Sequence, residues 1–111
     1  STTGGWSAVG CYPLSGSTAT LTTFNFTNNL FQNIITADAS GLALGIYSTS
    51  GTATYNINTN MISDVIAASN TTNYSSSMGM YLANTGTDNI YYNTINMAST
   101  AKTGYGATGI L

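Results

Sequence analysis

The sequence predicts an all-β repeat protein, a coil of short parallel strands that stacks on itself as a β-solenoid. The first observation is a strand-like motif that starts with glycine and recurs at Gly10, Gly45, Gly79 and Gly109. The second is an asparagine motif that recurs in the same order, with equivalent positions at Asn29, Asn60 and Asn93. Two motifs that share a period of 30 to 35 residues indicate a repeat architecture.

The composition bounds the chain to one small domain of very low charge. Its 111 residues include one Lys or Arg, three Asp or Glu and no His, whereas a typical soluble domain is about a quarter charged. A single cation argues against nucleic-acid binding, because phosphate neutralisation needs several. No apolar run approaches the roughly 20 residues of a transmembrane helix, so no membrane insertion is expected. The lone cysteine, Cys11, aligns with Ile46 and Met80, which predicts a small core residue rather than a reactive thiol.

Each repeat is expected to begin with a strand of alternating apolar residues, the first at about residues 9–14. In the second copy Leu42, Leu44 and Ile46 alternate with Ala43, Gly45 and Tyr47. Period-two alternation is typical of a strand with one buried face. We therefore expect Leu44 and Ile46 inside and Gly45 and Tyr47 outside.

Two further strands are expected in each repeat. A turn at Gly16, Gly51 or Gly86 leads to a second strand at about residues 20–26, 54–57 and 89–91, with residues 18–21 as an extra bulge or loop. A third, short strand follows the asparagine position, with Phe31, Ile62 and Ile95 pointing inward. The variable connections are 34–41, 66–77 and 98–107. The middle one is the longest and most polar, and insertions in repeat proteins commonly bind ligands.

This pattern divides one β-solenoid segment, residues 1–111, into coils at about 9–43, 44–77 and 78–107, with a fourth starting at 108–111. Equivalent strands should lie about 4.8 Å apart, and the connection rule for parallel strands favours a right-handed winding. The last strand stops within a copy at Leu111. The expected partners are therefore flanking coils of a longer chain, or identical chains stacked end to end as a filament.

The strand and asparagine pattern resembles the right-handed parallel β-helix proteins, which include pectate-lyase-like folds and secreted or surface repeat proteins of Bacteroidota-type bacteria. In that family stacked asparagines form a ladder at a tight turn between strands. The resemblance implies this role for Asn29, Asn60 and Asn93. A second column, at Asn25, Asn56 and Asn89, leaves open which column forms the ladder. The resemblance also implies a secreted or cell-surface location, but one fold hosts many functions.

The residues offer no catalytic constellation. Asp38, Asp64 and Asp88 occupy different phases of the repeat, there is no His or Arg, and nothing is present to activate a Ser or Thr. Calcium would have only Asp64 or Asp88 with asparagine and backbone oxygens, without the Asp-rich nonapeptide of calcium-binding β-rolls. We therefore expect no catalysis by this segment, no metal and no cofactor.

An outward tyrosine column, Tyr12, Tyr47 and Tyr81, is the sharpest functional hint in the sequence. Such a column either packs on sugar rings, or its rings stack on each other or beneath a neighbour. The leading hypothesis is thus a structural or adhesive segment of an extracellular solenoid. The alternative is a carbohydrate-binding module that uses this column and the 66–77 loop. A third hypothesis is a non-catalytic fragment of a polysaccharide-degrading enzyme.

Threonine rows raise one more hypothesis, a flat ice-binding face. The rows are Thr18, Thr20 and Thr22 in the first copy and Thr52 and Thr54 in the second. The third copy offers only Thr87 before Asp88. We therefore expect the row to be broken there, which argues against ice binding.

Overall fold

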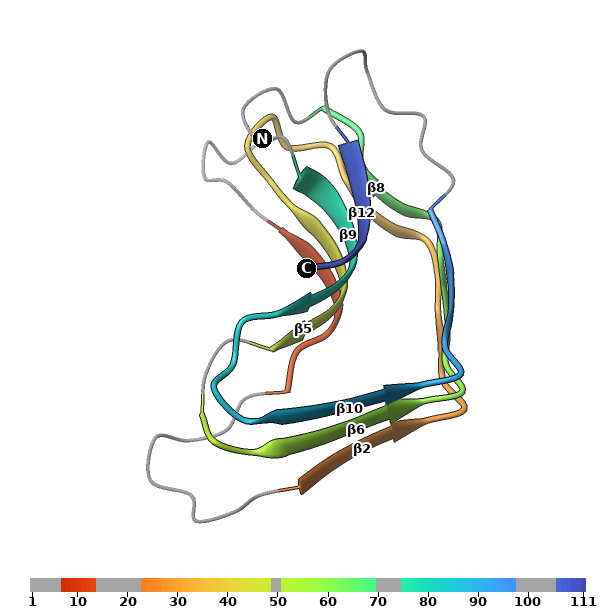
Figure 1. Cartoon of the computed structure of the whole chain (residues 1–111). Helices are drawn as coiled ribbons and strands as arrows, with labels where there is room; N and C mark the ends of the chain where they lie inside the picture. Colours follow the sequence, from red (N-terminus) through yellow and green to blue (C-terminus); the bar gives the residue numbers. More distant parts are fainter. Residues whose placement is uncertain (1–6, 14–22, 49–50, 70–74, 98–105) are drawn as a thin grey trace.

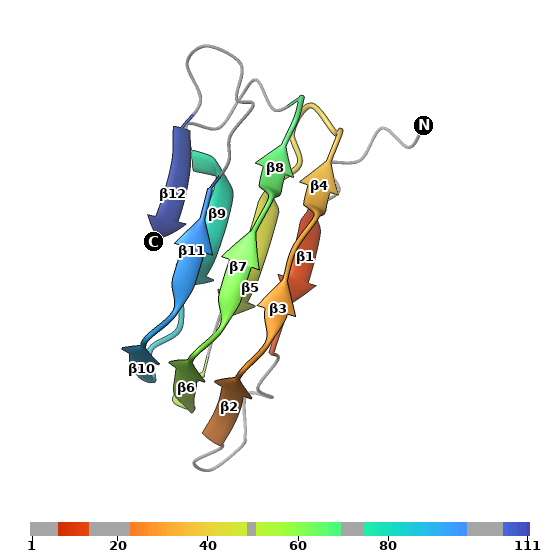
Figure 2. The same ribbon diagram turned by 90° about the vertical axis from the view of Figure 1, so that its right-hand side faces the viewer.

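The computed structural model describes residues 7–13, 23–48, 51–69, 75–97 and 106–111, and these form twelve strands and no helix. Every strand pairing is parallel, and the strands form four separate sheets (Figures 1 and 2). The prediction of an all-β chain of parallel strands is confirmed.

Each sheet collects the equivalent strands of successive repeats. The first sheet contains β1 (Ala8–Cys11), β5 (Ala43–Ser48), β9 (Ser75–Leu82) and β12 (Gly106–Ile110). The second contains β2 (Thr23–Thr27), β6 (Thr54–Asn58) and β10 (Thr87–Tyr91), and the third β3 (Leu30–Phe31), β7 (Met61–Ser63) and β11 (Thr94–Asn96). The fourth contains β4 (Ile34–Thr36) and β8 (Val65–Ala67). The chain visits the sheets in this order and then returns to the first.

The fourth sheet corrects the expectation of three strands per repeat. Residues 34–41 and 66–77 were expected to be variable connections, yet β4 and β8 pair there with Ile34 opposite Val65. β4 and β8, which begins one residue before the second of these connections, both carry β-branched residues, Ile34, Ile35 and Thr36 in one and Val65 and Ile66 in the other, which favour a pleated, half-buried surface. Of these residues, Ile34 and Val65 belong to the core cluster and extend it beyond the third sheet.

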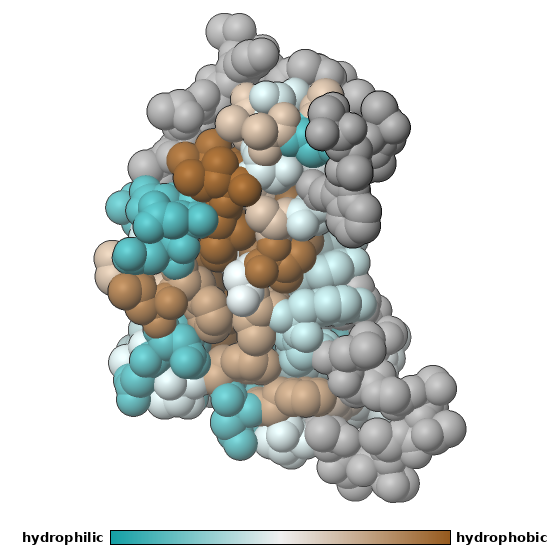
Figure 3. All heavy atoms as spheres, turned by 180° about the vertical axis from the view of Figure 1, so that it is seen from behind, coloured by the Kyte–Doolittle hydropathy of each residue, from teal (hydrophilic) through white to brown (hydrophobic). Residues whose placement is uncertain are grey.

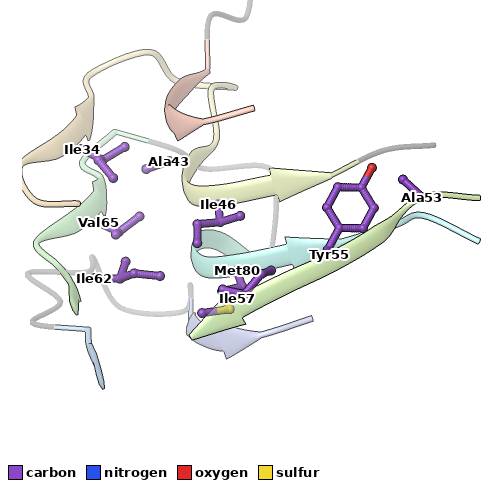
Figure 4. Packing of buried hydrophobic residues seen from close by; sticks show 9 residues of the cluster. All are labelled: Ile34, Ala43, Ile46, Ala53, Tyr55, Ile57, Ile62, Val65 and Met80. Atoms are coloured by element: carbon purple, nitrogen blue, oxygen red, sulfur yellow. The ribbon is translucent and has the colours of Figure 1, made fainter. Parts of the chain in front are cut away.

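The core lies between the sheets and draws one or two side chains from each strand of the middle repeat. Ile57 of β6 and Ile62 of β7 are fully buried, and Phe31 of β3 and Ile95 of β11, which pair with Ile62, pack against the same cluster. The inward orientation predicted for Phe31, Ile62 and Ile95 is thus confirmed. Figure 4 shows Ile34, Ala43 and Val65 meeting at one end of this cluster and Ala53 and Tyr55 at the other.

The first sheet departs from the predicted alternation, because its inward face changes along the strand. Ala43 and Ile46 both belong to the core cluster, whereas Leu44 is buried outside it. A Cβ added to Gly45 would meet Cγ2 of Ile62 at 2.7 Å, so Gly45 also faces inward rather than outward. The register between β5 and β9 is interrupted at Gly45, between the pairs of Leu44 and Ile46, and β5 curves along its length (Figure 1). This bend lets two consecutive residues, Gly45 and Ile46, both face the core.

The glycines form an inward column where two sheets approach closely. A Cβ on Gly10 would meet Cδ1 of Ile34 at 2.6 Å, and one on Gly79 would meet Cγ2 of Ile95 at 2.5 Å. The isoleucines of the opposite wall therefore pack directly against the glycine backbone. This explains why the repeating motif starts with glycine, which the alternation alone had assigned to the outer face.

Candidate functional site

The three tyrosines predicted to align form one stacked column on the first sheet. The ring centroids of Tyr12 and Tyr47 are 4.9 Å apart with planes 16° from parallel. Those of Tyr47 and Tyr81 are 5.3 Å apart at 7°, and the two residues are paired in the register of β5 and β9. The rings therefore stack on each other, as one of the two interpretations of this column expects.

Stacking limits what the tyrosine column offers to a ligand. Tyr47 has a neighbouring ring on each side and is half-buried, so its faces are covered and its edge and hydroxyl remain. Burial raises the pKa of the Tyr47 hydroxyl above its ordinary value, and the neighbouring hydroxyls of Tyr12 and Tyr81 raise it further. Among the three, Tyr12 is the most exposed, at 47%.

Asn29, Asn60 and Asn93 lie in one hydrogen-bonded column at the turn after the second sheet. The backbone N–H and the Nδ2 of Asn29 both donate to Oδ1 of Asn60, at 3.0 Å each. Asn60 donates in the same way to Oδ1 of Asn93, at 3.0 and 2.9 Å. The Nδ2 of Asn60 also donates to the Phe26 carbonyl oxygen at 2.8 Å, and that of Asn93 to the Ile57 carbonyl oxygen at 2.8 Å. The three amides thus link the turns of successive repeats by hydrogen bonds.

The residue before each of these asparagines adopts a left-handed backbone conformation. Asn28, Thr59 and Tyr92 have φ values of 57°, 55° and 53°. Asparagine tolerates this region, whereas β-branched and bulky residues are outliers there. Thr59 and Tyr92 are therefore strained positions, each at a cost of about 1–2 kcal/mol.

The second asparagine column, Asn25, Asn56 and Asn89, is also a ladder. The Nδ2 of Asn56 donates to Oδ1 of Asn25 at 2.8 Å, and the Nδ2 of Asn89 donates to Oδ1 of Asn56 at 2.8 Å. These residues lie on the outward side of the second sheet, because they alternate with Phe24, Phe26, Tyr55 and Ile57, which contact the core. The sequence showed both columns, and the structure gives a ladder to each.

A complete threonine row lies beside this outer ladder, which corrects the expected break at the third repeat. The strand register pairs Thr23 with Thr54 and Thr54 with Thr87. The Thr-x-Thr pattern between repeats instead groups Thr18, Thr20 and Thr22 of the first copy with Thr52 and Thr54 of the second. Residues 18, 20 and 22 lie outside the described part of the chain, and the true register partner of Thr54 is Thr23.

The three acidic residues lie apart. Asp38 accepts from the backbone N–H and the hydroxyl of Ser40, and Asp64 accepts from the Ser63 hydroxyl at 3.3 Å. Asp88 accepts two bonds from Nδ2 of Asn84. Within the described ranges, no three side chains of the metal-binding types come together. Residue 102 and the central part of the 66–77 connection, residues 70–74, lie outside those ranges, whereas Ile66 and Ala67 belong to β8 and residues 75–77 to β9.

Cys11 occupies the position predicted from its alignment. It pairs with Ile46 in the register of β1 and β5, and Ile46 pairs with Met80. Cys11 is half-buried and is not in a disulfide, and burial raises the pKa of its thiol. A raised pKa lowers the fraction of reactive thiolate.

Comparisons with known protein families, with curated proteins and with solved structures found no match for this chain. In the part of the chain that the structure describes, no helix is long and apolar enough to cross a membrane.

Proposed function

We propose that this chain is a structural and adhesive segment of an extracellular or cell-surface β-solenoid, wound as a right-handed parallel β-helix of about three coils. The observation that carries the proposal is the common register of the sheets. Tyr47 lies over Tyr81, Asn56 over Asn89 and Ile62 over Ile95. A stack of layers in register is held together along its axis by backbone hydrogen bonds and displays side chains at equivalent positions in each repeat.

The first repeat forms one end of the stack, and its half-buried core residues support the proposed partners, which are a flanking coil or another copy of the chain. Seen from behind, where β1 to β4 lie, hydrophobic residues run through the middle of the molecule (Figure 3). Phe24, Phe26 and Phe31 of this repeat pack on the core but stay only half-buried. A further coil, supplied by flanking residues or by another copy of the chain, would bury these rings and pair the open strand edges.

A tandem chain tests the solenoid directly. Cys11 follows Gly10 as Ile110 follows Gly109, and both positions belong to the first sheet. Residues 11–111 can therefore be joined in register after Gly109. We expect small-angle X-ray scattering to show a particle lengthened by about 14 Å, from three further coils of about 4.8 Å, at an unchanged cross-section. An increase in cross-section without lengthening would refute the proposal.

Electron microscopy of the chain, paired with its intact mass, separates the two modes of assembly. Filaments whose subunit has the mass of this chain would mean that copies stack end to end. A larger mass together with discrete particles would mean that flanking sequence of a longer protein supplies the covering coils.

A carbohydrate-binding module built on Tyr12, Tyr47 and Tyr81 is the second candidate. Its support is the exposed outer edge of the column, in which Tyr12 presents the largest open surface. The mutual stacking of the rings leaves Tyr47 only its edge and hydroxyl for a sugar. The test is glycan binding by a Tyr47→Ala, Tyr81→Ala double variant, which should be lost if the column is the site. The third candidate, a non-catalytic fragment of a polysaccharide-degrading enzyme, predicts catalytic residues in coils that flank this segment.

A further inference from the structure

The outward face of the second sheet is a regular, uncharged array of polar side chains. Three columns run across β2, β6 and β10, and in strand order they consist of Thr23, Thr54 and Thr87, then Asn25, Asn56 and Asn89, then Thr27, Asn58 and Tyr91. Neighbours within a column are about 4.8 Å apart, and adjacent columns are about 6.6 Å apart along the strand. The second sheet is nearly straight in the view along the stack (Figure 1).

The middle column holds its amides in fixed orientations. Asn56 donates to Asn25 and accepts from Asn89, both at 2.8 Å. A primary amide carries two N–H donors and an oxygen with two lone pairs. The ladder uses one donor and one lone pair of Asn56, which leaves the others for a ligand. Because the ladder has already ordered these side chains, a ligand that bonds to them loses less conformational entropy.

Two exposed tyrosines stand at the edge of this array. Tyr91 ends the third column and is 56% exposed, and Tyr92, at the corner that follows, is 91% exposed. Unlike the stacked column of Tyr12, Tyr47 and Tyr81, neither ring stacks on another ring in the described part of the chain. Both therefore present open aromatic faces.

Tyr92 also occupies a backbone position that suits it poorly. Its φ is 53°, at the turn where the first repeat has Asn28. Asparagine relieves the strain of this conformation and tyrosine does not. No ring contact among the described residues compensates for that strain, so packing of the ring within the chain does not account for tyrosine at this turn.

We propose that this face binds an uncharged polysaccharide. Tyr91 and Tyr92 would stack on its sugar rings, and the outer asparagine ladder of Asn25, Asn56 and Asn89 would form hydrogen bonds to its hydroxyl groups. Sugar rings offer C–H faces to aromatic side chains and hydroxyl groups to amides and threonines. The outward columns carry no charge, and the chain has no Arg and one Lys, so an anionic glycan or a nucleic acid would lack cationic partners. This inference names the ligand of the adhesive role and rests on the proposed function, but its site is distinct from the Tyr12 column.

Affinity electrophoresis of the whole chain tests the proposal, with native gels that contain hydroxyethyl cellulose, xylan or laminarin and a matched gel that contains anionic polygalacturonate. We expect retardation by at least one of the three neutral polymers and none by polygalacturonate. Tyr91→Ala and Tyr92→Asn should each weaken that binding by about tenfold, the typical effect of losing an aromatic anchor. Tyr92→Asn should do so with an unchanged or higher Tm, because asparagine fits the turn.

Two matched variants make the result specific. Thr59→Asn relieves the equivalent strain one repeat earlier and should raise the Tm without weakening binding. Tyr12→Ala removes the most exposed ring of the stacked column and should also leave binding intact. The proposal is overturned if no neutral polymer retards the chain, if Tyr92→Asn binds as well as the unmodified chain, or if Tyr12→Ala causes the loss instead. None of these outcomes affects the lengthening expected of the tandem chain, so the two proposals fail separately.

Discussion

Asn60 contacts Asn93 twice, since its backbone N–H and its side-chain Nδ2 both donate to the same Oδ1 atom, at 3.0 and 2.9 Å. Asn60 itself is only 2% exposed. Its Oδ1 accepts the same pair of bonds from Asn29 in the preceding repeat. One amide therefore satisfies buried polar groups on both sides of the turn and fixes the stacking of three repeats.

We expect Asn60→Ala to lower the free energy of unfolding by about 2–4 kcal/mol, because it removes several bonds and leaves buried partners, including the Phe26 carbonyl, unsatisfied. Urea denaturation followed by circular dichroism measures this loss. Asn56→Ala, in the outer ladder, is the matched control and should cost about 1 kcal/mol or less, because water can replace its bonds. Equal losses for the two variants would contradict the special role of the buried ladder.

Gly45→Ala should destabilise the chain more than its position on a strand suggests. The new methyl group would overlap the carbonyl oxygen of Gly79 and Cγ2 of Ile62. The first of these is backbone and cannot rotate away, so we expect a loss of about 1–3 kcal/mol in the free energy of unfolding. Gly109→Ala is the control, since its Cβ would meet nothing within 4 Å. If the two variants unfolded at the same urea concentration, the close approach of β5 and β7 would be in doubt.

These positions show how far the sequence specifies the fold. Asn29, Asn60 and Asn93 could be identified in advance because one residue type fills one position in every repeat. The inward face of Gly45 could not, because strict alternation assumes a straight strand, and β5 bends where its inward face changes. The sequence pattern around Gly45 does not show that bend, because a glycine has no side chain whose polarity would indicate the face it lies on.

The candidate ligand surface was harder to predict from the sequence, for a different reason. The Thr-x-Thr pattern groups Thr18, Thr20 and Thr22 with Thr52 and Thr54, whereas the backbone register joins Thr54 to Thr23. The extra residues in the first repeat shift that pattern, although the alignment of Asn25, Asn56 and Asn89 already places Thr23, Thr54 and Thr87 two residues earlier in each repeat. Tyr91 and Tyr92 are visible in the sequence as adjacent tyrosines, but the strain at Tyr92 is a property of the backbone.

The tyrosine column should make the chain sensitive to alkali. The pKa of Tyr47 is raised in the folded state, first by burial and then by Tyr12 and Tyr81. Its contribution to stability is therefore complete below the unfolded pKa of about 10 and is lost as the pH rises through the folded value. Nuclear magnetic resonance of chains labelled at tyrosine Cζ should show the Tyr47 hydroxyl titrating above its ordinary value of about 10.

Variants of its neighbours check the cause. Tyr12→Phe and Tyr81→Phe each remove one adjacent hydroxyl and should lower the pKa of Tyr47 toward its ordinary value without abolishing the shift, because burial is the larger cause. A Tyr47 pKa that did not respond to either change would show that the neighbouring hydroxyls do not contribute.

Tyr55→Phe should stabilise the chain. The Tyr55 side chain is fully buried against Phe24, with ring centroids 5.2 Å apart, and its hydroxyl has no hydrogen-bond partner among the described residues. Burying an unpaired hydroxyl costs about 1–3 kcal/mol, so its removal should raise the free energy of unfolding by a similar amount. The position that pairs with Tyr55 in the first repeat is already phenylalanine, Phe24, which shows that the site accepts this ring. Urea denaturation of the variant provides the measurement, and a decrease in stability would mean that the Tyr55 hydroxyl has a partner in solution.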